Sequence, residues 1–276
     1  MAECSHDCSS CAQNCAERKN PQSLLAKLNP HARVQKVIAV CSGKGGVGKS
    51  MVTALLACAA QKAGLQAGVL DADITGPSIP KMFGVHERAK ADQSGVYPVK
   101  SAGGVQLMSL NLLLENETDP VIWRGPLITG TVTQFWTEVV WEDVDILFVD
   151  MPPGTGDTTL TVFQSLPVAG IVFVTTPQEL VGMIVEKAVK MARSMNLPLT
   201  ALVENMSYFV CPDCGKRHDL FGRSHLAETA QKFGIKTTAC LPLSSEVAVA
   251  ADRGGIEGLR ISQLDPVLQA ITTLVK

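Results

Sequence analysis

The sequence lacks an excess of charge of either sign. Its 24 Lys and Arg residues nearly balance its 26 Asp and Glu residues, which gives a formal net charge of -2. A protein that attracts nucleic acid through its overall field needs a basic excess or a local basic patch, and the sequence shows neither. We therefore expect no nucleic-acid partner.

Long apolar runs are also missing. No stretch reaches the roughly 18 consecutive apolar residues that would span a bilayer. The first residues, MAECSHDCSSCAQNC, lack the basic and apolar regions of a secretory signal, and the chain has no internal repeat. These absences predict a soluble, cytoplasmic protein without a membrane partner. Since 46% of the 276 residues are hydrophobic, the chain can still build a sizeable core.

Short β-branched runs alternate with helical patterns along most of the chain. The strand-like runs are KVIAVCS, AGVLDAD, DILFVDMPP, GIVFVTTP and LTALVENM, and the helical pattern SMVTALLACAAQKAG follows the first of them. Such alternation is typical of βαβ units. It predicts an α/β fold over residues 34–276, an open, mostly parallel, twisted sheet with helices on both faces.

Four further segments complete the predicted fold. VYPVK and VQLMSL are expected to form two more strands, one of them antiparallel at an edge, and residues 127–141 and 179–195 are expected to form covering helices. The tail, ISQLDPVLQAITTLVK, has apolar residues at helical spacing and predicts a helix that faces the core. Residues 1–33 form a separate cysteine-rich segment.

A phosphate-binding loop is predicted at residues 43–50, GKGGVGKS, which fit the pattern G-x-x-x-x-G-K-[ST]. The pattern lies directly after an apolar strand and before a helix, the context that this loop requires. We expect Lys49 to reach the β- and γ-phosphates of ATP and the Ser50 hydroxyl to ligate Mg²⁺. The alternative is a glycine-rich turn without a ligand. The residues predicted to surround the phosphates are Gly43, Lys44, Gly45, Gly46, Val47, Gly48, Lys49 and Ser50.

Carboxylates follow two of the predicted strands. Asp71 and Asp73 end VLDAD, and Asp150 ends ILFVD. Open α/β sheets place their ligands at the carboxyl ends of strands. Asp150 is therefore expected to hold the magnesium shell, and Asp71 is expected either to join the site or to cap the loop.

Lys44 is a second lysine that the simple loop does not need. With it, KGGVGKS resembles the deviant Walker A loop of the MinD, ParA and nitrogenase iron protein class. The resemblance implies an ATP-dependent homodimer in which Lys44 crosses the interface to the partner's nucleotide. A solvated loop lysine is the alternative. The resemblance also implies that Asp73 orients the attacking water, so that Lys44, Lys49 and Asp73 are the catalytic residues, and that the Gly154 N–H meets the γ-phosphate.

Three motifs together, DADITGPS, DMPPGTGD and VENMSYFVCPDCG, resemble the Mrp/ApbC family of ATPases over roughly residues 35 to 255. That family binds iron-sulfur clusters and transfers them to apoproteins. The resemblance implies that Asn205 hydrogen-bonds adenine, whereas an Asn in a turn at a strand end is the alternative. It also implies a [4Fe-4S] cluster that bridges two subunits.

Cys211 and Cys214 form a CxxC pair that offers two thiolates. Zinc and iron-sulfur clusters usually take four, so one chain supplies half of a site and two chains related by a two-fold axis supply all of it. A zinc-bridged dimer and an unmetallated loop are the alternatives. Cys41, Cys58 and Cys240 are expected to be small core residues.

A second group of cysteines lies near the start of the sequence. On a straight helix its first and last members would be about 16 Å apart, so a shared metal requires a folded-back loop. A cluster, zinc and a reactive thiol tail are the alternatives. The group consists of Cys4, Cys8, Cys11 and Cys15, with His6 beside it.

The sequence as a whole predicts an ATP-binding iron-sulfur carrier that works as a homodimer and serves apo iron-sulfur proteins. A positioning ATPase of the MinD or ParA kind is one alternative, but it needs a basic amphipathic tail or a basic DNA-binding face, which the sequence does not offer. An ATP-dependent electron donor that resembles the nitrogenase iron protein is the other.

Overall fold

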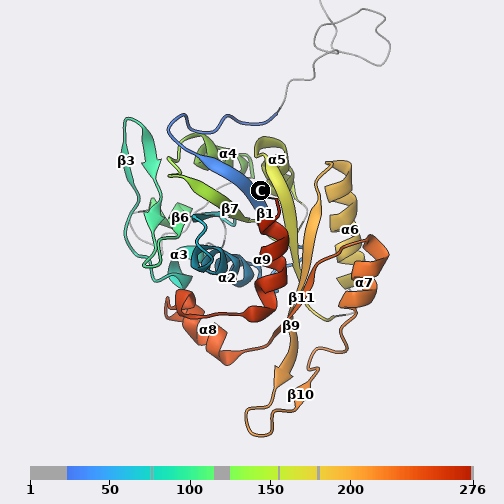
Figure 1. Ribbon diagram of the computed structural model, residues 1–276. Coiled ribbons are helices and arrows are strands. Elements are labelled where there is room, and N and C mark those ends of the chain that lie inside the picture. Colours follow the sequence, from blue (N-terminus) through green and yellow to red (C-terminus); the bar gives the residue numbers. More distant parts are fainter. Residues whose placement is uncertain are drawn as a thin grey trace, which may run out of the picture.

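The computed structural model describes residues 24–74, 76, 78–114, 125–154, 156–178 and 181–274 (Figure 1). The predicted cysteine group of residues 4–15 lies outside the described residues, as does most of the cysteine-rich segment that contains it. The first described strand begins at Val34, where the predicted main domain begins.

A mostly parallel sheet lies at the centre of the described chain. Its strand order is β10-β9-β8-β1-β7-β2-β6-β5, and β11 also pairs with β9. The strands that pair in parallel are β1 (Val34–Ser42), β2 (Ala67–Asp71), β6 (Gln106–Met108), β7 (Val144–Asp150), β8 (Val168–Thr175), β9 (Leu199–Val210) and β11 (Thr238–Pro242). Two short strands pair antiparallel to their neighbours, β5 (Val99–Lys100) and β10 (Arg217–His218). The predicted α/β fold, with an antiparallel strand at the edge, is confirmed.

Helices cover both faces of this sheet, which explains why the central strands are nearly continuous apolar runs rather than alternating ones. All five residues of β2 and the last six of β1 are buried. One face packs against α2 (Lys49–Lys62), α3 (Ile79–Met82), α8 (Ser245–Asp252) and α9 (Asp265–Thr272), and the other against α4 (Gly125–Thr137), α5 (Asp157–Ser165), α6 (Val181–Ser194) and α7 (Leu226–Phe233) (Figure 1). Within the described residues, no helix is long and apolar enough to cross a membrane.

Local chemistry shifts several predicted boundaries. The predicted strand VYPVK is divided at Pro98, which has no N–H for a ladder: Gly95–Tyr97 forms β4 and pairs with β3 (Lys90–Asp92), while β5 pairs with β6. The tail helix is shorter than predicted, because a 3-10 turn at Ser262–Leu264 precedes α9. Other 3-10 turns lie at Leu110–Leu112 and Ile256–Gly258. The predicted core contact of the tail helix is confirmed, since Ile271 is fully buried.

Candidate functional site

The phosphate-loop residues 43–48 connect β1 to α2. Gly46 and Gly48 have φ angles of 77° and 81°, in the left-handed region that glycine occupies without steric cost. At Gly48 a side chain is excluded for two reasons: the left-handed φ, and a Cβ that would lie 2.2 Å from the Asn205 Nδ2 atom. The loop and Asn205 are therefore in close contact, although 157 positions separate Gly48 from Asn205 in the sequence.

A buried ion pair lies at the start of α2. Lys49 Nζ is 2.7 Å from Asp150 Oδ1 and 3.7 Å from Asp73 Oδ2, and the Lys49 and Asp150 side chains are almost completely buried. The Thr53 hydroxyl donates to the same Asp150 oxygen at 2.9 Å. The structure thus brings together three of the residues that the sequence predicted for one site, Lys49, Asp73 and Asp150.

The other Asp150 oxygen is suited to magnesium. Asp150 Oδ2 is buried and has no hydrogen-bond partner among the described residues. The Ser50 hydroxyl belongs to the same cluster, since its oxygen is 3.4 Å from Lys49 Nζ. Carboxylate and hydroxyl oxygens are the hard ligands that Mg²⁺ takes, usually together with water and phosphate oxygens. Ser50 and Asp150 therefore fit the predicted Mg²⁺, which when bound neutralises charge on the phosphates.

Asp71 caps the segment that carries Asp73. Its carboxylate accepts the N–H groups of Asp73 at 3.2 Å and Ile79 at 3.4 Å, and the Ser109 hydroxyl at 3.2 Å. Burial, and after it the nearby charge of Asp150, raise the pKa of Asp71 to about 8. Of the two roles predicted for Asp71, the structure shows the capping contacts.

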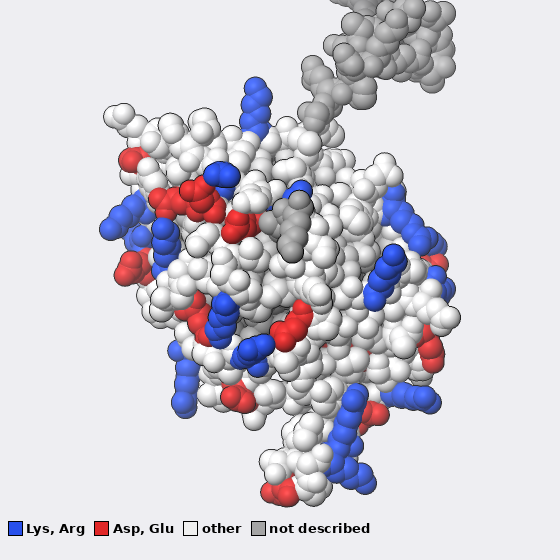
Figure 2. Space-filling view, in the orientation of Figure 1, with Lys and Arg blue, Asp and Glu red and all other residues white. Residues whose placement is uncertain are grey.

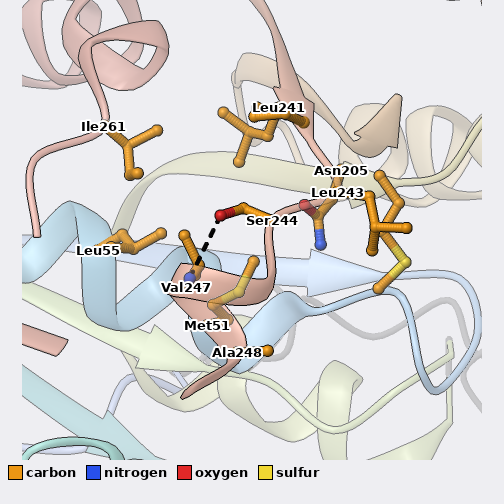
Figure 3. A pocket seen from close by; sticks show the side chains of 11 residues that line it. Met51, Leu55, Asn205, Leu241, Leu243, Ser244, Val247, Ala248 and Ile261 are labelled. Atoms are coloured by element: carbon orange, nitrogen blue, oxygen red, sulfur yellow. Dashed lines mark hydrogen bonds between the residues drawn. The ribbon is translucent and has the colours of Figure 1, made fainter. Parts of the chain in front are cut away.

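An apolar pocket opens beside the phosphate loop (Figure 3). Asn205, which is 1% exposed, lies at its edge and donates from Nδ2 to the Val47 carbonyl at 2.9 Å. At the start of α8, Ser244 Oγ accepts the N–H of Val247 at 3.3 Å. An apolar pocket with a few polar groups suits a flat aromatic ring such as a nucleobase. The lining residues are Met51, Leu55, Asn205, Met206, Leu241, Pro242, Leu243, Ser244, Val247, Ala248 and Ile261.

Lys44 and Gly154 lie at the edge of the phosphate loop. The Lys44 ammonium donates to the Gln178 side-chain oxygen on an exposed surface. The Gly154 N–H donates to the Ser42 carbonyl at 2.8 Å, so it is bonded within the protein rather than directed at a ligand.

The CxxC pair lies at the tip of a hairpin that projects from the body of the molecule. Strand β9 runs beyond the sheet to Val210, and β10 pairs back against it (Figure 1). The Cys211 N–H donates to the Lys216 carbonyl at 2.9 Å, and Gly215 closes the turn with a φ of 68° by donating to the Cys211 carbonyl at 2.9 Å. We call residues 211–216 the cysteine knuckle.

The knuckle favours a thiolate. The N–H groups of Cys214 and Asp213 lower the pKa of Cys211, and the Cys214 thiol lowers it further. Cys211 is half-buried and Cys214 is exposed. Among the described residues, no third His, Cys, Asp or Glu joins them in a group that could hold a metal ion. Each chain therefore offers two ligands at this position.

Charges on the molecular face in Figure 2 are interspersed, with basic and acidic side chains next to one another. Lys and Arg side chains also lie along one flank of the projecting hairpin (Figure 2). Arg217 of β10 packs on Tyr208 of β9, because its guanidinium carbon lies 3.7 Å from the centre of the Tyr208 ring.

Comparison with known proteins assigns this arrangement to a family. Residues 33–275 match the ParA family profile described as NUBPL iron-transfer P-loop NTPase. The chain belongs to this family. It is 43% identical over 265 residues to an iron-sulfur cluster carrier protein of Clostridium perfringens, covering 91% of this chain and 93% of that protein. The carrier protein of Methanocaldococcus jannaschii is 42% identical over 263 residues, covering 92% and 90%.

Solved structures show the same fold. A nucleotide-binding protein of Archaeoglobus fulgidus, determined in complex with ADP and with cobalt found, superposes with a TM-score of 0.77 at 41% identity and covers 84% of this chain and 91% of that one. MinD of Pyrococcus furiosus has a TM-score of 0.61 at 17% identity, covering 87% and 99%, which is a likeness of fold alone.

The other described cysteines of this P-loop NTPase, Cys41, Cys58 and Cys240, were predicted to be small core residues. Cys41 and Cys58 are buried, and burial raises the pKa of each thiol to about 12, so the core prediction for both is confirmed. Cys240 lies in β11 as predicted, but it is only half-buried.

Sequence reasoning missed several residues that the fold of this NTPase brings to the site. Thr53 on α2, Ser109 after β6 and Gln178 after β8 contact Asp150, Asp71 and Lys44 respectively. None of the three belongs to a recognisable motif. The residues that line the apolar pocket were also missed, except Asn205, because apolar residues at a strand end look like any other part of a core.

Proposed function

We propose that this protein is an ATP-dependent iron-sulfur cluster carrier that works in the cytoplasm as a homodimer. Its cargo is a [4Fe-4S] cluster, which it delivers to apo iron-sulfur proteins. The observation that carries the proposal is the union of two sites on one strand: Asn205 of β9 closes the phosphate loop, and Cys211 follows the end of the same strand. The names of relatives with more than 40% identity support it.

The nucleotide half of the function uses the phosphate loop and the apolar pocket. Adenine enters the pocket at Asn205, and the phosphates lie along residues 43–50. Lys49 leaves its 2.7 Å contact with Asp150 to reach the β- and γ-phosphates. This exchange is possible because the phosphates replace one anionic partner of the lysine with another. Asp150 and Ser50 then hold the Mg²⁺ shell.

Hydrolysis requires the groups around the γ-phosphate to rearrange. Asp73, with its carboxylate 3.7 Å from Lys49 Nζ, orients the attacking water. The Gly154 N–H gives up the Ser42 carbonyl to meet the γ-phosphate. Lys44 gives up Gln178 and reaches across the dimer interface to the partner's phosphates. Lys44 is half-buried, and this movement breaks the hydrogen bond that its ammonium donates to Gln178.

The cluster half of the function uses the cysteine knuckle. Two thiolates in each chain require two more from elsewhere, and a second copy of the chain supplies them across a two-fold axis. The backbone N–H groups that lower the Cys211 pKa stabilise the thiolate that the cluster needs. The N-terminal group Cys4, Cys8, Cys11 and Cys15 is proposed as a second metal site.

The test is metal analysis after anaerobic reconstitution of the full chain in which Ser replaces the four cysteines of residues 4–15. We expect about two irons and two sulfides per chain, since two chains share one cluster. Cys211→Ser together with Cys214→Ser should remove both, whereas Cys240→Ser, a half-buried cysteine in β11, should not. Zinc without sulfide, or iron that survives the double substitution, would refute the cluster assignment. The difference in iron between this variant and the wild type measures the N-terminal site.

A further inference from the structure

Strand β9 joins the apolar pocket to the cysteine knuckle over a short distance. Cys211 lies six positions after Asn205, directly beyond the end of the strand. In the sheet, the first part of β9 is held between β8 and β11. A displacement of the backbone at Asn205 can therefore reach the cysteines through only a few residues.

The strand is irregular between the two sites. Glu204 pairs with Cys240 and Tyr208 pairs with Pro242, so three residues of β9, Asn205 to Ser207, lie opposite the single residue Leu241 of β11. This is a β-bulge, a feature that re-aims side chains next to functional sites. At its centre Met206 has a φ of 54°, in the left-handed region that a residue with a side chain adopts only when its surroundings impose it.

Contacts on both sides hold the bulge in this conformation. On the pocket side, the Asn205 amide donates to the Val47 carbonyl at 2.9 Å. On the knuckle side, the Leu243 N–H donates to the Tyr208 carbonyl at 2.7 Å. Met206 and Leu243 both line the apolar pocket, with Asn205 at its edge (Figure 3). A ligand in the pocket thus contacts Asn205, which precedes the left-handed residue, and Leu243, whose N–H is bonded to Tyr208 beyond it.

We propose that Met206 is a positioning residue that couples nucleotide binding in the apolar pocket to the exposure of the cysteine knuckle. Ligand contacts displace Asn205 and Leu243, and the left-handed backbone of Met206 transfers the displacement to Tyr208 and from there to Cys211. Nucleotide state then sets how tightly the knuckle encloses its cargo. This inference rests on the nucleotide site proposed above.

Two substitutions at Met206 separate backbone geometry from side-chain packing. Met206→Asn removes the long apolar side chain but retains the left-handed conformation, which Asn tolerates. Met206→Gly also removes the side chain, and it allows the backbone to leave that conformation freely. If the geometry carries the coupling, Met206→Asn keeps it and Met206→Gly loses it.

The assay uses the metal-free, reduced full chain with and without saturating ADP, and ADP affinity is measured separately for each variant by calorimetry. Iodoacetamide labels the thiols, and mass spectrometry follows the tryptic peptide 194–216, whose only cysteines are Cys211 and Cys214. In the wild type and in Met206→Asn we expect ADP to change the labelling rate by about fivefold or more, the lower end of typical coupling between sites. In Met206→Gly we expect ADP to bind without changing the rate.

Three results would overturn the inference. If ADP binds the wild type and the labelling rate does not change, the two sites are not coupled. If Met206→Gly keeps the change, Met206 does not transmit it, and if both variants lose it, the side chain acts by packing rather than through the backbone. Failure of the wild type to bind ADP is distinguishable from these, because it refutes the proposed nucleotide site as well.

Discussion

Three glycines of the phosphate loop offer a graded test of its geometry, because the structure gives each a different reason to be glycine. Gly45 has no atom within 4 Å of an added Cβ and has no left-handed φ; Gly46 has a φ of 77° but open space; Gly48 has a φ of 81° and would place its Cβ 2.2 Å from Asn205 Nδ2. Substitution by Ala therefore causes neither backbone strain nor a clash at Gly45. It causes backbone strain at Gly46, and both strain and a clash at Gly48.

The expected changes in the free energy of unfolding follow from these differences. Gly45→Ala should be neutral or stabilising by about 0.5 kcal/mol, because Ala loses less chain entropy on folding. Gly46→Ala should cost about 1 kcal/mol for a left-handed Ala. Gly48→Ala should cost about 3 kcal/mol, because Asn205 must also move and give up its hydrogen bond to Val47. Urea denaturation of the nucleotide-free protein measures all three.

The clash itself is tested in a background that lacks the Asn205 side chain. In Asn205→Ala, the further change Gly48→Ala should cost only the backbone strain of about 1 kcal/mol, so the two substitutions should be non-additive. The reasoning is refuted if Gly48→Ala costs no more than Gly46→Ala. It is also refuted if the cost of Gly48→Ala is the same with and without Asn205.

Three further predictions concern charged residues of the site. Lys49→Ala should abolish phosphate release from ATP, and undiminished turnover would contradict its assignment. Lys44→Ala should bind ATP but not hydrolyse it. In an equal mixture with Lys49→Ala, about half of the dimers are mixed and each has one intact site of two, so about a quarter of wild-type activity should return. A role of Lys44 within its own subunit predicts no such recovery. The pKa of Asp71 rises from 3.8 to about 8 on folding. Between pH 3.8 and about pH 8, Asp71 is therefore protonated in the native state and ionised in the unfolded state. The free energy of unfolding should therefore fall as pH rises through this range, and Asp71→Asn should reduce the slope between urea titrations at about pH 5 and about pH 8.

The fold class and the predicted position of the chemistry along the chain both follow from local sequence patterns. The strand and helix runs predict a parallel sheet because a strand covered on both faces is a nearly continuous apolar run, as β2 is before Asp71. The spacing of Gly43, Gly48 and Lys49, between an apolar strand and a helix, predicts a phosphate loop because such glycines let successive backbone N–H groups converge on phosphate oxygens. The CxxC pair predicts half of a metal site because two neighbouring thiolates fall short of a full ligand set. Each of these inferences uses residues that are close together in the sequence.

The direct contacts between distant residues of the site could not be predicted without the tertiary structure. Lys49 pairs with Asp150 across 101 positions, and Asn205 reaches Val47 across 158, because parallel strands joined by crossovers bring their carboxyl ends to one edge of the sheet. The left-handed Met206 was also unforeseen, since nothing in VENMSY marks a bulge. That conformation arises from the register of β9 against β11 and from contacts on both sides of it. Long-range packing, which local preference does not encode, fixed it there.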